Sequence, residues 1–377
     1  MLALFAVAFG TNVATPLFLI YDQRLDLSTW TVTALFAVYP LGLAPALAYA
    51  GPASDVLGRR ALVLPGLALS GVASIVMLFG DDSLWMLYLG RLLLGAVSGM
   101  VLAVASAWAQ ELDPGRPMAN ARMIGTVMYL GFGVGPLVSG VLGQWSSHPL
   151  VWPYLVHLVL VVAGLVAMPS IPETIQRTTA PIRPNLGVPS GSRRRFQRVI
   201  VPTALGVFGF PSLAFGLFPV LLRPAMHGFA VFVTGVVFLL SMGCIVPTQA
   251  WVGRVGADRA APLGLVLGTA GTVMGLVSFA TDWWPLLFPA SVAMGTASGM
   301  CITAGLRFVE QISSSEQRGA LSGSFYAAAY CGMLAPLVTS TVARGIGITP
   351  SLGLVVAVGA GLSWWLPIAL GSEPTPS

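Results

Sequence analysis

The loop between the second and third apolar runs of the chain reads Gly51-Pro-Ala-Ser-Asp55-Val-Leu-Gly58-Arg59-Arg60. The flanking runs are residues 29–50 and 61–80. Each has about 20 residues, the length at which an α-helix crosses the hydrocarbon core of a bilayer. A strand of a membrane β-barrel would instead alternate polar and apolar residues over about ten positions. The stretch therefore predicts two membrane-spanning helices joined by a short charged loop.

The composition extends this interpretation to the whole chain. Of 377 residues, 56% are hydrophobic and 8% are charged, and the mean hydropathy is +0.86. Soluble domains carry about 25% charged residues, so the composition excludes a soluble enzyme, a disordered protein and a nucleic-acid-binding domain. The net charge of +5 comes from 18 arginines without any lysine. It is expected to set membrane orientation.

Twelve runs of spanning length are predicted, which gives an all-α integral membrane protein. The first run is expected to be a retained span, because no basic segment precedes it. Residues 171–198 hold four prolines and six arginines and are predicted to form a cytoplasmic linker between two six-helix bundles, 1–170 and 199–377. The runs are 1–21, 29–50, 61–80, 84–110, 119–144, 150–170, 199–222, 229–251, 261–280, 284–308, 318–343 and 350–371.

The arginines predict the orientation. With the N-terminus inside, 14 arginines fall in cytoplasmic loops and three in external loops, at Arg24, Arg223 and Arg344. Positive loops remain on the cytoplasmic side, so both termini are predicted to lie in the cytoplasm of a multi-pass protein of the plasma (inner) membrane. We expect the bilayer and a small molecule as partners, no nucleic acid, and a monomer.

The two halves repeat each other. Residues 95–100 read G-A-V-S-G-M and residues 295–300 read G-T-A-S-G-M, while P-L-V occurs at 136–138 and at 336–338. Both matches have an offset of 200 residues. Two six-helix halves in parallel repeat are a transporter architecture, with the substrate site expected at their interface.

The loop quoted above resembles the signature loop of the major facilitator superfamily, G-x-x-x-D-R/K-x-G-R-R. Gly51, Asp55, Gly58, Arg59 and Arg60 match it, and Val56 departs from it. The resemblance implies a cytoplasmic gate. Gly58 would permit a tight turn, Asp55 would accept backbone N–H groups at a helix start, and Arg59 would pair with an acid of a neighbouring helix. The alternative is that the charges of this loop only set the orientation of the protein in the membrane.

The resemblance also places the partners of this loop at the ends of the fourth and eleventh helices. Glu111 and Asp113 close the fourth run, and Arg318-Gly319 begins the eleventh. Pro172-Glu173-Thr174 resembles another, shorter element of the superfamily.

Arg91 and two glycines of the fourth run, Arg91-x-x-x-Gly95-x-x-x-Gly99, are similar to a second motif of the superfamily. A charge about 10 Å below the outer surface costs several kcal/mol unless it faces protein or water. We expect Arg91 to serve in a cavity or a structural network. Snorkelling to the outer headgroups is the alternative.

The fifth run resembles the G-x-x-x-G-P-x-x-G-G motif of the drug:proton antiporters within the superfamily. Gly131, Gly135, Pro136 and Gly140 match, and Ser139 replaces one glycine. Small residues allow close helix approach, so general helix packing is the competing explanation.

Several polar and aromatic residues within spans are candidates to line a substrate cavity or to couple transport to protons. Each aromatic residue could instead serve packing, and His157 could be a hydrogen-bonded packing residue. Asp22 is the preferred proton carrier. The cavity candidates are Asn12, Tyr39, Arg91, Tyr129, Tyr326 and Tyr330, and the coupling candidates are Asp22 and His157.

These features predict a secondary active transporter rather than an enzyme, working by alternating access without a cofactor or metal. No G-x-x-x-x-G-K-[ST] phosphate loop occurs, so this chain is not expected to use ATP. The resemblance implies proton-coupled efflux of small amphipathic or drug-like molecules. A proton-coupled nutrient importer, a lipid translocator and a non-transporting sensor remain alternatives. Neither the substrate nor the coupling ion follows from the residues.

Overall fold

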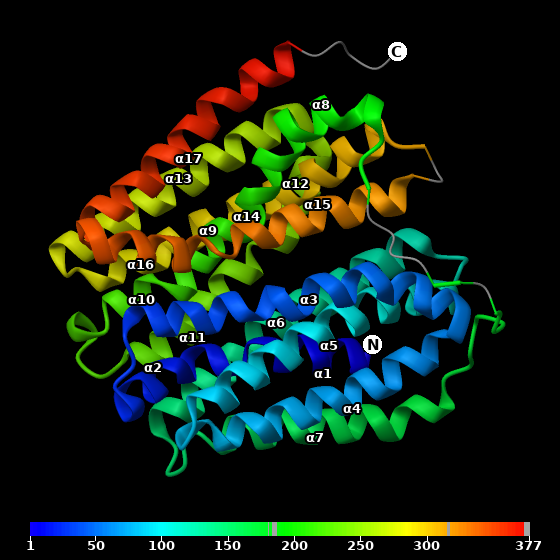
Figure 1. The fold of residues 1–377 in the computed structure, drawn as a ribbon, viewed down its shortest axis with the longest axis horizontal. Helices are drawn as coiled ribbons and strands as arrows, with labels where there is room; N and C mark the ends of the chain where they lie inside the picture. The colour runs from blue at the N-terminus through cyan, green and yellow to red at the C-terminus, as the bar shows by residue number, and fades with distance from the viewer. Residues whose placement is uncertain (180, 183–186, 315–316, 373–377) are drawn as a thin grey trace. The chain divides into compact units, whose positions relative to one another are not determined.

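The computed structural model describes residues 1–179, 181–182, 187–314 and 317–372, and these residues are helical, with turns and no strand (Figure 1). Twelve helical segments in this part of the chain are long and apolar enough to cross a membrane. The predicted all-α class and the twelve spans are therefore confirmed.

The helices of the first half are interrupted by one break and several prolines. Pro16 cannot donate to the helix that precedes it, and the first span is accordingly divided at Val13. The elements are α1 (Leu2–Asn12), α2 (Ala14–Leu25), α3 (Thr29–Leu57), α4 (Arg59–Leu78), η1 (Phe79–Asp81), α5 (Leu84–Glu111), α6 (Pro117–Trp145), α7 (Trp152–Ala167) and η2 (Met168–Ser170).

The second half contains a π-helical segment and further breaks. The elements are η3 (Ser190–Ser192), α8 (Arg193–Arg195), η4 (Phe196–Ile200, π-helical), α9 (Val201–Gly216), α10 (Phe218–Leu221), η5 (Pro224–Met226), α11 (Ala230–Gly243), α12 (Ile245–Val255), α13 (Ala257–Thr281), η6 (Trp284–Leu286), α14 (Leu287–Ile312), α15 (Arg318–Gly332), α16 (Ala335–Ile346) and α17 (Ile348–Gly371).

The chain divides into two compact units. Unit 1 comprises Met1–Asn185 with Val231–Leu239, and unit 2 comprises Leu186–Ala230 with Leu240–Ser377. The first part of α11 thus groups with unit 1, although its sequence position lies in the second half. Close backbone contact with α6, described below, accounts for this assignment.

Part of the predicted linker belongs to one unit or the other. Residues 171–178 form hydrogen bonds to unit 1, and a helical segment begins at Ser190 within unit 2. The assignment of residues 171–198 to a linker between two bundles, 1–170 and 199–377, stays a prediction. Residues 180 and 183–186 of this segment, including Arg183, lie outside the described part.

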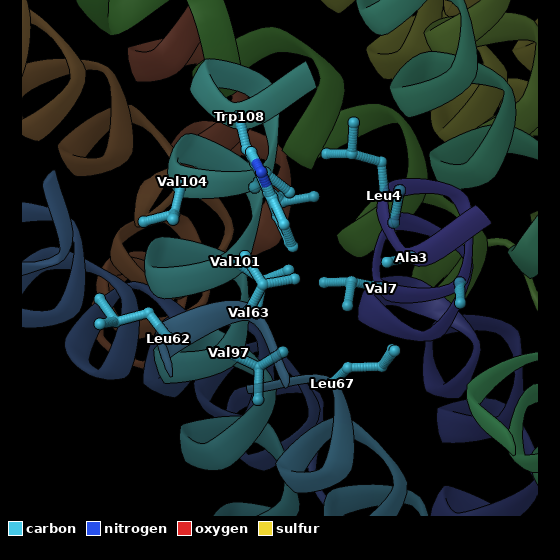
Figure 2. Close-up of a cluster of buried hydrophobic side chains, with 14 of the residues drawn as sticks. Ala3, Leu4, Val7, Leu62, Val63, Leu67, Val97, Val101, Val104 and Trp108 are labelled. Carbon is cyan, nitrogen blue, oxygen red and sulfur yellow. The ribbon is translucent and has the colours of Figure 1, made fainter. Parts of the chain in front are cut away.

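Unit 1 contains a core of aliphatic side chains closed by one tryptophan (Figure 2). Leu4 and Val7 of α1 face Val63 of α4 and Val101 of α5, and Trp108 lies over one end of the cluster. A small cavity of about 40 Å³ adjoins Trp108.

The sequence repeat is visible in the packing of each unit. Gly95 and Gly99 of α5 meet the backbone of α3, and Gly295 and Gly299 of α14 meet α11 and α12. A Cβ at Gly95 would lie 2.1 Å from a backbone oxygen of α3, and one at Gly295 would lie 2.2 Å from a backbone oxygen of α11. Because lipid tails are as apolar as the helices, such close contact is what holds membrane helices together.

Candidate functional site

Gly58 joins α3 to α4 in a backbone conformation that other residues rarely adopt. Its φ is 95° and its ψ is 153°, and a Cβ at this position would lie 2.8 Å from a carboxylate oxygen of Glu173. A side chain here would therefore meet both backbone strain and a collision. The tight turn that the sequence predicts for Gly58 is present, and it directs the first N–H groups of α4 toward Glu173.

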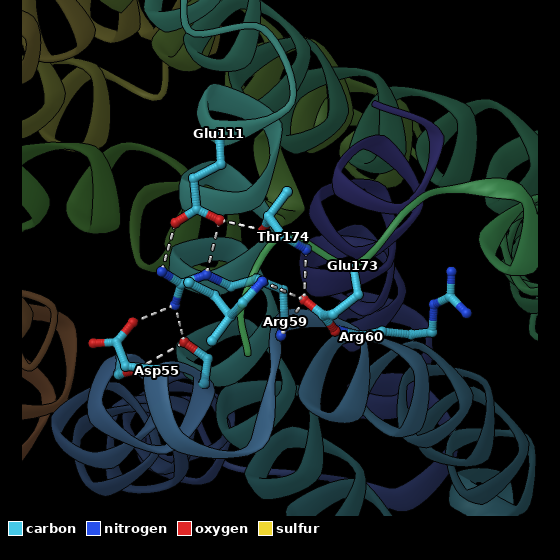
Figure 3. A network of polar contacts seen from close by, with 9 residues as sticks. Asp55, Arg59, Arg60, Glu111, Glu173 and Thr174 are labelled. Carbon is cyan, nitrogen blue, oxygen red and sulfur yellow. Dashed lines mark hydrogen bonds and ion pairs between the residues drawn. The ribbon is translucent and has the colours of Figure 1, made fainter. Parts of the chain in front are cut away.

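Arg59 is the centre of a polar cluster at this junction (Figure 3). Its guanidinium is buried and forms ion pairs with Glu111 at the end of α5 and with Asp55 in the last turn of α3, both at 2.6 Å. The hydroxyl of Ser54 also accepts from Nη1. The predicted pairing with an acid of a neighbouring helix thus involves Glu111.

Glu173 accepts the backbone N–H groups at the start of α4. The amides of Arg59 and Arg60 donate to its carboxylate at 3.0 and 2.9 Å, and those of Thr174 and Ile175 at 3.0 and 3.3 Å. A carboxylate at a helix N-terminus satisfies unpaired donors and complements the helix dipole. The start of α4 is thus capped by Glu173, and the acceptance of N–H groups at Arg318-Gly319 by Asp55 stays a prediction.

The environment of Glu173 lowers its pKa below the ordinary Glu value of 4.5. Burial acts to raise the pKa, but the four backbone donors stabilise the ionised form and outweigh it. Because the folded-state pKa is the lower one, this contribution to stability is present above pH 4.5 and is lost as the pH falls through the folded-state value.

The segment after η2, residues 171–174, forms hydrogen bonds with the same cluster. The guanidinium of Arg60 donates to the carbonyls of Ile171 and Pro169. The indole N–H of Trp108 donates to the carbonyl of Pro172. The hydroxyl of Thr174 donates to a carboxylate oxygen of Glu111. Pro172-Glu173-Thr174 is recognisable in the sequence only as a short resemblance, whereas its contacts with α4 and α5 are evident only in the structure. The first four N–H groups of any helix lack a partner within that helix. This need for an acceptor at the start of α4 is the sequence signal that points to a nearby acidic residue such as Glu173.

Two residues predicted for the gate lie apart from these contacts. Asp113 is exposed beyond the end of α5, where its backbone carbonyl accepts from the side-chain amide of Asn120 at 2.6 Å. A Cβ at Gly51 would meet no atom within 4 Å. Their assignment to the gate remains a prediction.

Arg91 is fully buried in unit 1, where it bonds to the backbones of two helices. Nη1 donates to the carbonyl of Thr11 at 3.0 Å, and Nε donates to the carbonyl of Leu35 at 3.2 Å. Each acceptor lies five residues before a proline of its span, Pro16 or Pro40, where helix geometry is perturbed. Arg91 therefore links two proline-containing spans and does not extend to the outer surface.

Three aromatic rings surround this guanidinium. The distances from Arg91 Cζ to the ring centroids are 4.9 Å for Tyr39, 5.7 Å for Phe18 and 5.8 Å for Phe36. Cation–π contacts of this kind partly replace hydration. Arg91 Nη2 and the side-chain oxygen of the buried Asn12 have no hydrogen-bond partner in the described structure. The structure thus places Asn12, Tyr39 and Arg91 in one region of unit 1.

The glycines of α6 form the contact surface for α1. A Cβ at Gly131 would lie 2.7 Å from a side-chain atom of α1, and one at Gly135 would lie 2.2 Å from the carbonyl oxygen of Phe9. Farther along α6, a Cβ at Gly140 would lie 3.0 Å from a backbone oxygen of the part of α11 that belongs to unit 1. Ser139, which departs from the antiporter motif, donates to the carbonyl of Val13 at the α1–α2 break.

His157 lies inside unit 1 between α1 and α4. Nδ1 is 2.6 Å from the hydroxyl of Ser74 and Nε2 is 3.3 Å from that of Ser70, while the ring stacks on Phe9. A Cβ at Gly10 would collide with the imidazole at 2.1 Å. These contacts are those of a hydrogen-bonded packing histidine, and a coupling role for it stays a prediction.

The remaining candidates are distributed over both units. Asp22 is half-buried near the end of α2, and its backbone carbonyl accepts from the amide of Leu27 at 3.1 Å. Tyr129 of unit 1 contacts a ring of its own helix, as does Tyr326 of unit 2. Tyr330 of unit 2 stacks on Phe208 at 4.6 Å.

Comparison with characterised sequences gives tetracycline resistance proteins and a triacylglyceride transporter among the relatives. The chain is 27% identical over 322 residues to the class B tetracycline resistance protein of Escherichia coli, covering 82% of this chain and 77% of that protein. It is 31% identical over 134 residues to the class H protein of Pasteurella multocida, which covers 35% of this chain and 32% of that protein. A triacylglyceride transporter of Mycolicibacterium smegmatis is 36% identical over 121 residues, covering 32% of this chain and 20% of that protein.

Solved structures share the fold over nearly the whole length. The nucleoside transporter NupG superposes with a TM-score of 0.73 at 14% identity, covering 98% of both chains. A POT family transporter crystallised with 5-aminolevulinic acid has a TM-score of 0.74 at 13% identity and covers 97% of this chain and 95% of its own. The profile of the Major Facilitator Superfamily matches residues 1–262. This match covers more than half of the sequence, and the chain therefore belongs to the major facilitator superfamily of membrane transporters.

Proposed function

We propose that this chain exports small amphipathic or drug-like molecules by alternating access, in exchange for protons. The observation that carries the proposal is the α6 surface formed by Gly131 and Gly135, which belong to the antiporter-like motif and pack directly on α1. The class B tetracycline resistance protein, similar over most of this chain, supports the same direction of transport. Proton-coupled import of a nutrient is the alternative on the same fold.

Lipid export is a second candidate, and the observation that favours it is the similarity to the triacylglyceride transporter. That match covers a third of this chain, whereas the match to the class B protein covers 82%. The drug exporter is therefore the preferred proposal.

Uphill efflux is expected to stop when the proton gradient is removed. Everted membrane vesicles containing the protein should accumulate a fluorescent amphipathic drug on energisation and release it after addition of a protonophore. Expression in an efflux-deficient bacterium should raise resistance to a drug panel that includes tetracycline. Accumulation unaffected by the protonophore would disprove proton coupling, and drug uptake into intact cells would indicate an importer.

The same vesicles test whether Asp22 is the residue that carries the proton. Asp22→Asn should abolish protonophore-sensitive transport while leaving drug binding intact. Asp26→Asn, an exposed residue four positions farther along, is the matched control and should transport normally. Normal coupling in both variants would exclude Asp22 and leave the export mechanism to another titrating group.

We expect residues 171–178 to face the cytoplasm. In a background without Cys244, Cys301 and Cys331, a cysteine at the exposed Gln176 should react with an impermeant maleimide in everted vesicles and not in intact cells. A cysteine at the exposed Ser147, at the predicted outer end of α6, should show the opposite pattern. Exchange of the two results would reverse the proposed orientation.

A further inference from the structure

Acidic side chains are confined to the ends of the described spans, whereas one arginine lies deep inside. Each acidic residue of these spans is within three residues of a helix end, and Arg91 is seven residues beyond the start of α5. Arg91 is 0% exposed. The other buried arginine of the described chain, Arg59, lies at a helix start beside two carboxylates. Among the described residues, the interior of unit 1 therefore contains a positive charge that no acidic side chain at the same depth balances.

The guanidinium of Arg91 has several partners, but none of them is an anion. Nη1 and Nε donate to the carbonyls of Thr11 and Leu35, and three aromatic rings lie against the group. Nη2 has no partner in the described structure. Because a guanidinium keeps its proton inside a protein, the charge persists. The Nη2 edge can therefore donate to a further acceptor.

Two more buried polar groups without a partner belong to the same turn of the first span. Asn12 is 7% exposed and Thr15 is 2% exposed, and neither Asn12 Oδ1 nor Thr15 Oγ1 has a hydrogen-bond partner among the described residues. The backbone at Val13 keeps helical angles, with φ −51° and ψ −40°. In a helix the carbonyl of one residue is directed toward the residue four positions later, so the Thr11 carbonyl that binds Arg91 is directed toward Thr15.

A polar ligand at this turn would recover the free energy that such groups lose on burial. The sign of its charge follows from Arg91, because electrostatic interactions are strong and extend far where the dielectric constant is low. An anionic oxygen is attracted to the guanidinium and fits its donor geometry, whereas a cation is repelled. Charged residues inside a span mark substrate or ion pathways, so the ligand expected here is the transported molecule.

We infer that Arg91, with Asn12 and Thr15, selects transported molecules that carry an anionic oxygen, such as a carboxylate or an ionised phenol. The inference rests on the proposed export function and specifies its substrate class. Arg91 Nη2 donates to the anionic oxygen, and Asn12 and Thr15 bind polar groups beside it. All three side chains are buried in this conformation, so binding requires the first span to move against its neighbours, as alternating access provides.

Two dyes that share a xanthene ring system but differ in charge test the inference. Fluorescein is an anion at neutral pH, and tetramethylrhodamine methyl ester is a cation. Fluorescence anisotropy with the purified full chain in phosphatidylcholine nanodiscs should show that fluorescein binds about tenfold more tightly. Equal or tighter binding of the cationic ester would overturn the inference.

Variants of Arg91 test whether this residue supplies the preference. Arg91→Gln should remove it, and Arg91→Lys, which keeps the charge, should retain most of it. The ratio of the two affinities does not depend on the amount of folded protein, so a loss of stability cannot imitate this result. Arg122→Gln, which removes an exposed arginine of α6, is the matched control and should keep the preference. An equal loss in Arg91→Gln and Arg122→Gln would overturn the inference in favour of general surface charge.

Transport in energised everted vesicles separates this inference from the proposed export function. Vesicles that contain the protein should accumulate fluorescein in preference to the cationic ester. Accumulation of the cationic ester instead would overturn the inference and leave export intact. Preferential binding of fluorescein without accumulation of either dye would support the anion site and reject export.

Discussion

Gly135→Ala is expected to destabilise the protein by about 3 kcal/mol, the upper range for inserting an atom into a packed interior. The added Cβ would lie 2.2 Å from the carbonyl oxygen of Phe9 on α1. A flexible side chain could rotate away from this contact, but a backbone carbonyl cannot, so α1 and α6 would have to separate. Because the first span lies within the core of unit 1, the whole unit should weaken. A melting curve of the purified protein in detergent should show a fall of several degrees.

Gly125→Ala provides the control on the same helix. A Cβ at Gly125 would meet no atom within 4 Å, and alanine favours helix over glycine by about 1 kcal/mol. This variant should melt at the wild-type temperature or slightly above it. Equal effects of the two substitutions would show that the glycine at position 135 serves helix flexibility rather than close packing.

Arg59→Gln is expected to have the second largest effect, about 2 kcal/mol. The substitution leaves Glu111 and Asp55 without their common cation and Ser54 without its donor. The loss is smaller than for a fully buried pair, because the side chain of Glu111 is 31% exposed. If the gate closes through this cluster, a change of 2 kcal/mol alters the ratio of two transporter states about 30-fold. Transport should fall while substrate affinity is retained.

A double-mutant cycle separates the ion pair from other effects of the substitution. Arg59→Gln, Glu111→Gln and the double variant should give a coupling energy of about 1 kcal/mol or more in thermal unfolding. Arg122→Gln removes an exposed arginine at the start of α6 and should be neutral. Additive single effects would mean that the Arg59–Glu111 contact does not contribute to stability.

The sequence alone was sufficient for the architecture because the governing signals are local. A run of about 20 apolar residues must cross the bilayer whatever its neighbours are, and this requirement yielded all twelve spans. The conformation at Gly58 also followed from its residue type and position, since a sharp turn between two helices needs a residue that tolerates positive φ. Gly95 and Gly295 could be paired through the internal repeat before any packing was known.

Only the tertiary structure decided which polar groups meet. Glu173 caps α4 from a position 114 residues beyond Arg59, because η2 ends beside the start of α4. Arg91 donates hydrogen bonds to carbonyls of two other spans. The indole N–H of Trp365 donates to the carbonyl of Arg198, to which Pro202 cannot donate because it has no N–H. Apolar periodicity determines which face of a helix is buried, but it carries no information about which donor on a distant helix reaches a given acceptor. That pairing depends on helix rotation and depth in the bundle, which close packing of small residues sets over the whole unit.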